Sequence, residues 1–564
     1  MTAAATDPLL SLSHYYLPVY KPRQVVLERG QGARVWDNQG REFIDLAAGI
    51  AVCGLGHNDP DLTAALIEQA GKLWHTSNVF YSEPPLRLAE ELVTASRFAE
   101  RVFLCNSGTE ANEVAIKLVR KWASSLGRPA HQRVIVTFRG SFHGRTLAAV
   151  TATAQPKYQE GYEPLPGGFR YVDFNDEVQL ETAMAAGDVA AVMLEPIQGE
   201  GGVMPAKPGF LQRVRELCDQ HNALVVLDEI QAGMGRTGTL FAHWQDNIKP
   251  DIVTLAKALG GGFPIGAMLA GPKVAEVMQF GAHGTTFGGN PLAAAVARVA
   301  LRKLSSPEIA HNVSRQSQAL RDGLGKINDE FKVFSQVRGR GLMLGAVLDK
   351  DFAGQAGPIL DHAAEHGLLT LQAGPDVLRF VPSLNITDEE IAEGLKRLRA
   401  AVQSFIASRS PTAVEPTVGR LYVRASRLMT LPNARLSVAV SACRPASRAP
   451  RTLTNRSSMN SVRSAHAPSS VTALANIAGS GLRPPSAPLH RMRPCRASAR
   501  VGTSCGIVCA ISAPLLVRIP IGSACAIRAT RSITPVSGAH AAMRAACHCA
   551  MLMVVCSASP SCCR

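Results

Sequence analysis

The chain has 564 residues, with 59 Lys and Arg against 44 Asp and Glu, and a formal net charge of +15. Residues 411–564 hold 19 Arg, no Lys and one acidic residue, whereas residues 1–410 hold 40 Lys and Arg against 43 Asp and Glu. The basic excess therefore belongs to the C-terminal part and does not mark residues 1–410 as a nucleic-acid-binding protein.

The N-terminal sequence lacks a basic stretch followed by a long apolar core, so we expect no secretory signal. No run reaches the ~18 apolar residues of a membrane span, so we expect no contact with a membrane. Residues 1–410 contain three cysteines, Cys53, Cys105 and Cys218. So few scattered cysteines fit a reducing compartment, and we expect a cytoplasmic protein.

Short apolar runs alternate with helical patterns between about residues 100 and 270. In the helical pattern after the first run, apolar residues recur at i, i+3, i+4, i+7 and i+8 from Ala111 to Val119. The strand-like runs are 102–105, 133–137, 189–194, 223–227 and 251–255. This alternation predicts an α/β fold with a large domain built on a mainly parallel sheet.

The chain is expected to form a large domain over residues 61–304 and a smaller α/β domain over residues 305–408 that ends in a helix at 387–408. Residues 1–60 are expected to pack with the smaller domain. No domain is expected in residues 411–564, which are rich in Arg, Ala, Ser and Cys, and this tail is expected to be unstructured.

Polar side chains follow several strand-like runs: Asn106, Glu195, Asp228 and Lys257. Parallel strands end at one edge of a sheet, where ligands bind, so these groups are expected to converge. A lysine can hold the aldehyde of pyridoxal phosphate as a Schiff base. An aspartate can keep the pyridine nitrogen protonated and so make the ring an electron sink. Lys257 and Asp228 therefore predict a pyridoxal-phosphate site.

The segment from Asn106 to Glu110 opens the predicted helix. Gly108 permits close backbone approach, Ser107 and Thr109 offer hydroxyl groups, and the helix start offers free N–H groups, which together suit a phosphate. The same spacing also fits a structural capping box between Ser107 and Glu110. The nearby lysine and aspartate favour the phosphate site.

The segment from Phe142 to Thr146 offers an aromatic ring and a guanidinium group. Phe142 can stack on a pyridine ring, and Arg145 can bind a carboxylate through two hydrogen bonds. His143 is open to two interpretations, a base or a packed structural residue.

Three further segments are candidates for binding. Glu200 lies in a glycine-rich stretch after a strand, Thr285 and Thr286 lie in a hydroxyl-rich loop that is either a phosphate contact or a turn, and Arg379 lies within a strand-like run. A charge within a strand is either at an edge or paired in a site. No metal site is expected, because the Cys505/Cys509 and Cys547/Cys549 pairs lack a second pair at finger spacing.

Taken together, these motifs resemble those of the class III aminotransferases, pyridoxal-phosphate enzymes of fold type I. The resemblance covers residues 12–408 and rests on the ordered segments N-S-G-T-E-A-N, F-H-G-R-T, E-P-I-Q-G-E-G-G, D-E-I-Q-A-G-M-G-R-T-G, A-K-A-L-G-G-G and T-F-G-G-N-P. Within the family, the likeness is greatest to the enzymes that act on N2-acetylornithine in arginine biosynthesis.

The resemblance implies roles for individual residues. Lys257 would bind the cofactor and move a proton, and Asp228 would hold the pyridine nitrogen. The other implied cofactor-binding residues are Gly108, Thr109, Phe142, Glu229, Ile230, Gln231 and Thr286. Thr286 would reach the phosphate bound by a neighbouring subunit, which implies a homodimer with shared active sites.

Arg145 and Thr285 would bind substrate, and Glu200 and Arg379 would form a switchable pair. Arg379 would bind the additional carboxylate of 2-oxoglutarate when Glu200 releases it, and Glu200 would neutralise Arg379 when N2-acetylornithine is bound. The products would be N-acetylglutamate 5-semialdehyde and glutamate. Ile50 replaces the tyrosine of ornithine aminotransferases, and this apolar residue favours an acylated α-nitrogen over a free α-amine.

Alternatives within the family are aminotransferases for succinyl-diaminopimelate, succinylornithine, 4-aminobutyrate or ornithine. An alternative of another class is a nucleic-acid-binding protein that uses the arginine-rich tail. A complete set of cofactor residues argues against it, so we expect no nucleic-acid partner. The composition of residues 411–564, with ten cysteines and no lysine, is typical of a GC-rich gene read out of frame. A basic appendage is the other interpretation of this segment.

Overall fold

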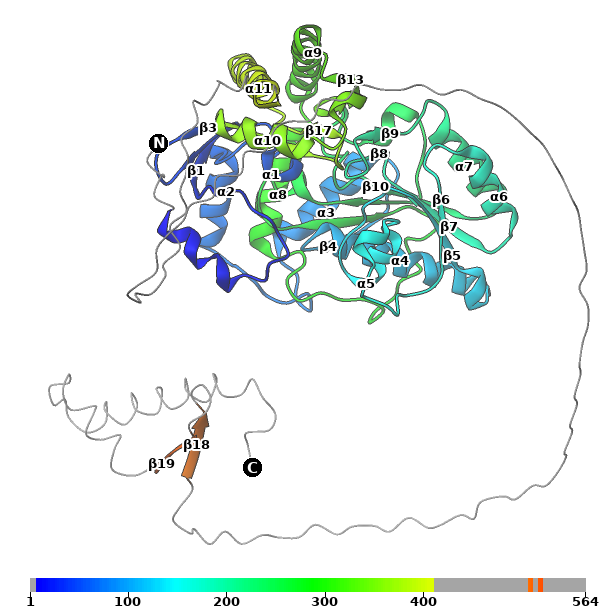
Figure 1. The fold of residues 1–564 in the computed structure, drawn as a ribbon. Helices are drawn as coiled ribbons and strands as arrows, with labels where there is room; N and C mark the ends of the chain where they lie inside the picture. The colour runs from blue at the N-terminus through cyan, green and yellow to red at the C-terminus, as the bar shows by residue number, and fades with distance from the viewer. Residues whose placement is uncertain (1–6, 410–505, 511–515, 521–564) are drawn as a thin grey trace, which may run out of the picture. The chain divides into compact units, whose positions relative to one another are not determined.

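The computed structural model describes residues 7–409 and the backbone of two short strands at 506–510 and 516–520. A seven-stranded sheet lies at the centre of the first part (Figure 1). In spatial order its strands are β4 (Arg101–Cys105), β12 (Gly266–Ala270), β11 (Ile252–Leu255), β10 (Leu224–Asp228), β7 (Val189–Leu194), β5 (Val134–Phe138) and β6 (Phe169–Val172).

Only β12 runs antiparallel to its neighbours in this sheet, whereas β11, β10, β7, β5 and β6 pair in parallel. The predicted mainly parallel sheet is therefore confirmed, and each of the five predicted strands lies within one residue of its expected position. Strands β6 and β12 were not predicted. β6 is interrupted by an arginine, and β12 is short and rich in small residues, so neither shows a strong apolar pattern.

Both faces of the sheet are buried, which explains the continuous apolar character of its central strands. Leu224 and Val226 of β10 pack in one core with helix α4 (Gly108–Ser125). Val225 and Leu227 of the same strand pack in a second core with α7 (Phe210–Gln220) and α8 (Pro291–Leu304). The remaining helices of this part are α2 (Pro60–Ala70), α3 (Glu83–Ser96), α5 (Leu147–Ala152) and α6 (Glu177–Ala185).

A four-stranded antiparallel sheet follows along the chain, in the order β13 (Phe334–Arg340), β14 (Met343–Leu348), β17 (Val377–Phe380) and β16 (Leu371–Gln372). It is accompanied by α9 (Pro307–Phe331), α10 (Ala356–Glu365) and α11 (Asp388–Arg409). Helix α11 matches the predicted terminal helix. Figure 1 shows α9, α10 and α11 at one end of this part.

The N-terminal strands β1 (Leu27–Gln31), β2 (Arg34–Asp37) and β3 (Glu42–Asp45) form another sheet, completed by β15 (Leu368–Leu369), which pairs in parallel with β3. The short turn α1 (Ala48–Ala51) follows β3, and the two-residue strands β8 (Ile197–Gln198) and β9 (Met204–Pro205) pair with each other. The N-terminal segment is thus hydrogen-bonded to a strand more than three hundred residues away.

The chain divides into two units, Met1–Arg427 and Leu428–Arg564. In the second unit, the described residues form one antiparallel pair, β18 (Gly506–Ala510) with β19 (Leu516–Pro520), within the tail that was expected to be unstructured. Both segments carry β-branched residues, which favour strands. The other residues of 411–564 lie outside the described residues. The interpretation that this segment comes from a gene read out of frame therefore stays a prediction. None of the described helices is long and apolar enough to cross a membrane.

Candidate active site

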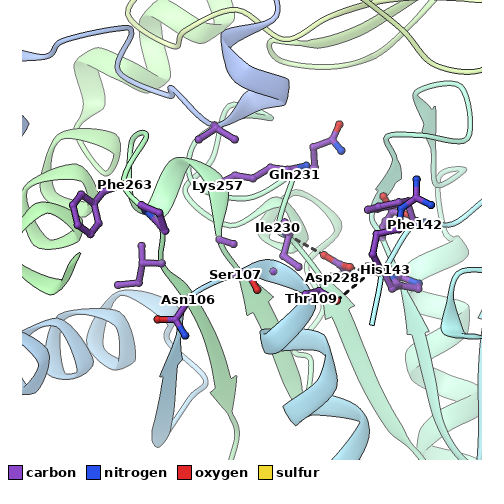
Figure 2. A pocket seen from close by; sticks show the side chains of 18 of the residues that line it. Asn106, Ser107, Thr109, Phe142, His143, Asp228, Ile230, Gln231, Lys257 and Phe263 are labelled. Atoms are coloured by element: carbon purple, nitrogen blue, oxygen red, sulfur yellow. Dashed lines mark hydrogen bonds and ion pairs between the residues drawn. The ribbon is translucent and has the colours of Figure 1, made fainter. Parts of the chain in front are cut away.

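A cavity of about 440 Å³ lies where the central parallel strands end (Figure 2). Asn106 follows β4, Phe142 follows β5, Glu195 follows β7, Asp228 ends β10 and Lys257 follows β11. The expected convergence of polar groups at this edge is therefore observed. Eight of the predicted site residues line the cavity: Gly108, Thr109, Phe142, Arg145, Asp228, Ile230, Gln231 and Lys257.

Asp228 is buried, and its carboxylate is held by three donors. Oδ2 accepts hydrogen bonds from Asn112 Nδ2 at 2.8 Å and from His143 Nδ1 at 2.8 Å, and Oδ1 accepts one from the backbone N–H of Ile230 at 3.1 Å. An ionised carboxylate only accepts, so Nδ1 of His143 carries the proton. The side chain is thus fixed and negatively charged at the edge of the cavity.

His143 lines the cavity and packs against Asp228, which favours a structural role over that of a base. Its ring is fully buried, and its backbone N–H donates to Thr153 Oγ1 at 2.7 Å. Asn112, which the sequence analysis overlooked, also donates to the His143 carbonyl at 2.7 Å and accepts from Thr254 Oγ1 at 2.8 Å. A fully buried asparagine within an apolar helix face was the signal that could have identified it.

Lys257 begins a 3-10 turn directly after β11 and has a left-handed backbone with φ of 46°. A residue with a Cβ adopts this conformation at a cost of roughly 1–2 kcal/mol, so the surrounding fold must impose it. Burial lowers the pKa of Lys257 to about 8, and the Arg379 guanidinium acts in the same direction, whereas the Glu200 carboxylate opposes it. An amine with such a pKa is partly neutral near pH 8 and suits nucleophilic and proton-transfer chemistry.

Helix α4 begins at the cavity. Ser107 Oγ accepts from the backbone N–H of Glu110 at 3.3 Å, and Glu110 Oε2 accepts from the N–H of Asn106 at 2.6 Å, so the capping interaction is present. The first N–H groups of the helix still have no partner within it. Gly108 packs so closely on Ile230 that a Cβ on Gly108 would lie 2.8 Å from Ile230 Cδ1. Capping and an anion site are therefore compatible here.

Thr109 is held by the loop that carries Phe142 and Arg145. Its hydroxyl oxygen lies 3.0 Å from Thr146 Oγ1 and accepts from the Arg145 N–H at 3.3 Å. Gly144 has φ of 141°, and a Cβ there would lie 2.2 Å from Thr109 Oγ1. Only glycine allows the loop to approach the helix start so closely.

Arg145 is exposed and presents its guanidinium beside two aromatic rings. Its Cζ lies 3.9 Å from the ring centroid of Tyr158 and 5.4 Å from that of Phe142. Stacking on Tyr158 restricts the arginine while leaving its N–H groups at the cavity wall for an anion. Tyr158 was not predicted.

Glu200 and Arg379 form an ion pair behind Gln231. Arg379 Nη1 donates to Glu200 Oε1 at 2.5 Å, to Gln231 Oε1 at 3.2 Å and to the Gly199 carbonyl at 3.3 Å. Arg379 is 2% exposed and lies in β17 between β14 and β16, so it is paired within a site and not placed at an open edge. Neither charged residue lines the cavity, but Gln231 connects the pair to it.

Glu195 lies beneath Phe142. Its carboxylate accepts from the N–H of Phe142 at 2.9 Å and from the N–H of Gly199 at 3.1 Å. Burial raises the pKa of Glu195 to about 7, although His143 and these two N–H groups act in the opposite direction. Glu195 therefore joins the Phe142 loop to the loop that carries Glu200.

Besides Glu200 and Arg379, three predicted residues lie outside the cavity. Glu229 points away from it, with its carboxylate accepting from His243 Nδ1 and from the N–H of Ala242, both at 2.7 Å. Successive residues leave a strand on opposite sides, so the Glu229 side chain does not follow that of Asp228 into the cavity. The cofactor-binding role of Glu229 stays a prediction. Thr285 Oγ1 accepts a hydrogen bond from Asn106 Nδ2 at 3.2 Å, and Thr286 lines a separate small cavity.

Comparison with known proteins places this site in a family. Residues 15–402 match the family model described as aminotransferase class-III. The acetylornithine aminotransferase of Xanthomonas campestris is 81% identical over 407 residues, which are 72% of this chain and all of that protein. The succinylornithine transaminase of Yersinia enterocolitica is 50% identical over 70% of this chain and 96% of that protein.

Solved structures similar to this chain are also aminotransferases. The N-acetylornithine aminotransferase of Stenotrophomonas maltophilia is 80% identical, with a TM-score of 0.64 over 71% of this chain and all of that one. The ornithine aminotransferase of Toxoplasma gondii is 35% identical, with a TM-score of 0.68 over 71% of this chain and 96% of that one. The chain belongs to the class III aminotransferases.

Proposed function

We propose that this chain transfers the terminal amino group of N2-acetyl-L-ornithine to 2-oxoglutarate, giving N-acetylglutamate 5-semialdehyde and L-glutamate. The observation that carries the proposal is 81% identity along the full length of a protein named acetylornithine aminotransferase. The ion pair of Glu200 and Arg379 supports it, because one pocket must accept two substrates that differ by a carboxylate.

Class III aminotransferases use pyridoxal 5'-phosphate, and a structure of the T. gondii ornithine aminotransferase has this group at its active site. The residues of this cavity fit the cofactor. Asp228 offers a buried carboxylate for the ring nitrogen, Phe142 and Ile230 offer apolar surfaces, and the start of α4 with Thr109 offers donors for a phosphate. When bound, the cofactor supplies an electron sink and a carbon that carries the amino group between two substrates.

The chain's own residues would orient the substrate and move the proton. Lys257 Nζ would hold the cofactor and carry the proton removed from the substrate carbon that bears the nitrogen. Arg145 would bind the α-carboxylate, with Thr285 nearby through Asn106. Glu200 would neutralise Arg379 while the donor is bound, because an unpaired charge in this buried place is costly. Rotation of Glu200 would then free Arg379 for the additional carboxylate of 2-oxoglutarate.

We also propose a homodimer with shared active sites. The apolar side chains of Val79, Phe80 and Tyr81 are exposed in one loop. The side chain of Phe287, next to Thr286, is exposed in another. The two loops are joined, since Asn78 Nδ2 donates to the Thr285 carbonyl at 3.0 Å. An exposed apolar patch of this kind is typical of a protein interface. A second copy seated here would bring Thr286 toward its partner's cavity.

We also propose a large domain over residues 61–304 and a smaller one over residues 305–408, with residues 1–60 packed beside the smaller domain. The pairing of β3 with β15 supports this place for residues 1–60. We also propose a cytoplasmic location. Cys53, Cys105 and Cys218 are all free thiols, as a reducing compartment requires.

The visible spectrum of the purified protein tests the proposed reaction. N2-acetylornithine added without a keto acid is expected to remove the absorption band of the bound cofactor, and 2-oxoglutarate is expected to restore it. A band that is lost with glutamate but persists with N2-acetylornithine would instead point to another donor, such as N2-succinylornithine, ornithine or 4-aminobutyrate. Absence of any band after addition of pyridoxal phosphate would contradict the proposal.

Replacing Gly144 with alanine is expected to weaken cofactor binding by roughly tenfold or more, because the new Cβ would displace the Thr109 hydroxyl. Cofactor affinity can be measured by the change in protein fluorescence on titration. Gly161→Ala is the matched control: Gly161 has φ of 81°, so alanine is strained there too, but a Cβ would meet nothing within 4 Å. Equal affinity losses in both variants would contradict the role of the Gly144 contact.

A further inference from the structure

Four consecutive residues beside the cavity have left-handed backbone conformations. Ala48, Gly49, Ile50 and Ala51 have φ of 43°, 64°, 66° and 61°. Three of them carry a Cβ, so this turn persists only where surrounding contacts impose it. Val52, the next residue, returns to φ of −85° and lines the active-site cavity. The turn thus sets where one wall of the cavity lies.

The carboxylate of Asp45 holds the start of this turn. Its Oδ1 accepts from the N–H of Ala47 at 2.8 Å and from the N–H of Ala48 at 3.0 Å. Its Oδ2 is bound by His57 Nε2 at 2.7 Å. Because both oxygens are engaged, Asp45 cannot rotate away from the two N–H groups that begin the turn.

His57 is itself fixed. Its backbone N–H donates to the Gly32 carbonyl at 2.8 Å, and its carbonyl accepts from the Gly32 N–H at 3.0 Å. Gly30 leaves the space that His57 fills, since a Cβ on Gly30 would lie 2.7 Å from His57 Cβ. Asp45 first, and then Cys53, raise the pKa of His57 to about 10 against the opposing effect of burial, so the ring stays charged near neutral pH. The Asp45–His57 contact is therefore a charge-assisted hydrogen bond between anchored groups.

Both ends of the segment are tied to the chain that follows β17. The Leu46 carbonyl accepts from the N–H of Val381 at 2.9 Å, and the Gly54 carbonyl accepts from the N–H of Leu384 at 2.7 Å. Arg379 lies in β17, so the turn and this arginine belong to one hydrogen-bonded unit. These bonds join backbone groups and do not involve the Asp45 or His57 side chains, so the place of β17 and Arg379 does not depend on those side chains.

We propose that Asp45 and His57 are positioning residues that determine the affinity for the amino donor by holding the left-handed turn, and with it Val52, at the cavity. This inference rests on the proposed function. The donor brings an acylated nitrogen and an aliphatic chain, which need an apolar wall at a defined place. The acceptor, 2-oxoglutarate, binds through two carboxylates to arginines and depends less on that wall.

Steady-state kinetics of His57 variants test the inference. His57→Leu removes the donor to Asp45 and is expected to raise KM for N2-acetylornithine by about tenfold or more, because small displacements of positioning groups have effects of this size. KM for 2-oxoglutarate is expected to change by less than about twofold. His57→Gln keeps an N–H donor and is expected to recover most of the donor affinity. Asp45→Asn provides a second, isosteric test should His57→Leu not fold.

His362→Leu is the matched control. His362 is similarly exposed and also pairs with an acidic residue, Glu365, at 3.6 Å, but it lies on α10 and does not line the cavity. Unchanged donor KM in His57→Leu, or equal increases for both substrates, would overturn the inference while leaving the proposed function intact. A wild-type protein that does not use N2-acetylornithine at all would overturn both.

Discussion

Replacing Lys257 with alanine is expected to leave the fold intact and to lower kcat by more than about 10⁴-fold, since it removes the amine that moves the substrate proton. Alanine tolerates the left-handed backbone at position 257 no worse than lysine, so the strain at φ of 46° is unchanged. Removing a buried amine whose pKa is lowered to about 8 also relieves a desolvation cost. The loss of activity should therefore occur without loss of thermal stability.

Circular dichroism and steady-state turnover measured on the same sample separate these two effects. Lys273→Ala is the matched control, because Lys273 is exposed, lies 3.4 Å from Asp219 and 3.6 Å from Asp251, and does not line the cavity. This control should retain wild-type kcat. Turnover by Lys257→Ala within tenfold of wild type would refute the role of Lys257, and a collapse of the melting temperature would show that the residue is structural.

The strands and the convergence of polar groups were predictable because both follow from local patterns. Apolar runs identify buried parallel strands, and the residue that ends such a strand lies at the ligand-binding edge. Asp228 and Lys257 were found in this way. For Glu229 the resemblance gives a motif but not the direction in which the side chain leaves it, and in the structure this side chain turns toward His243.

Other features depend on contacts between distant parts of the chain, which no local pattern reveals. Asn112 and Asp228 lie 116 residues apart, and Arg379 and Glu200 lie 179 apart. The left-handed turn at Ala48–Ala51 contradicts the intrinsic preference of its alanines and isoleucine. Tertiary contacts impose it, so the sequence could indicate the importance of Ile50 but not its conformation.

Replacing Asp228 with asparagine is expected to lower kcat by about 10²- to 10³-fold and to weaken cofactor binding, with little change in shape. The amide cannot stabilise a protonated ring nitrogen by charge. The Asp228 carboxylate accepts hydrogen bonds from Asn112 Nδ2, His143 Nδ1 and the N–H of Ile230. The amide of asparagine would replace one accepting oxygen with an NH₂ group that faces these donors. One of these donors must then lose its partner in a buried site.

Asp251→Asn is the matched control for this substitution. Asp251 is similarly buried, but it precedes β11 at the opposite end of the sheet and pairs with Arg215 at 2.6 Å. Asp251→Asn should lower the melting temperature and leave cofactor affinity and kcat unchanged. A cofactor analogue methylated on the ring nitrogen carries a permanent positive charge and should restore part of the activity of Asp228→Asn. If the analogue restores nothing and the melting temperature falls as far as in the control, Asp228 supports the fold, and the electronic role assigned to its carboxylate is wrong.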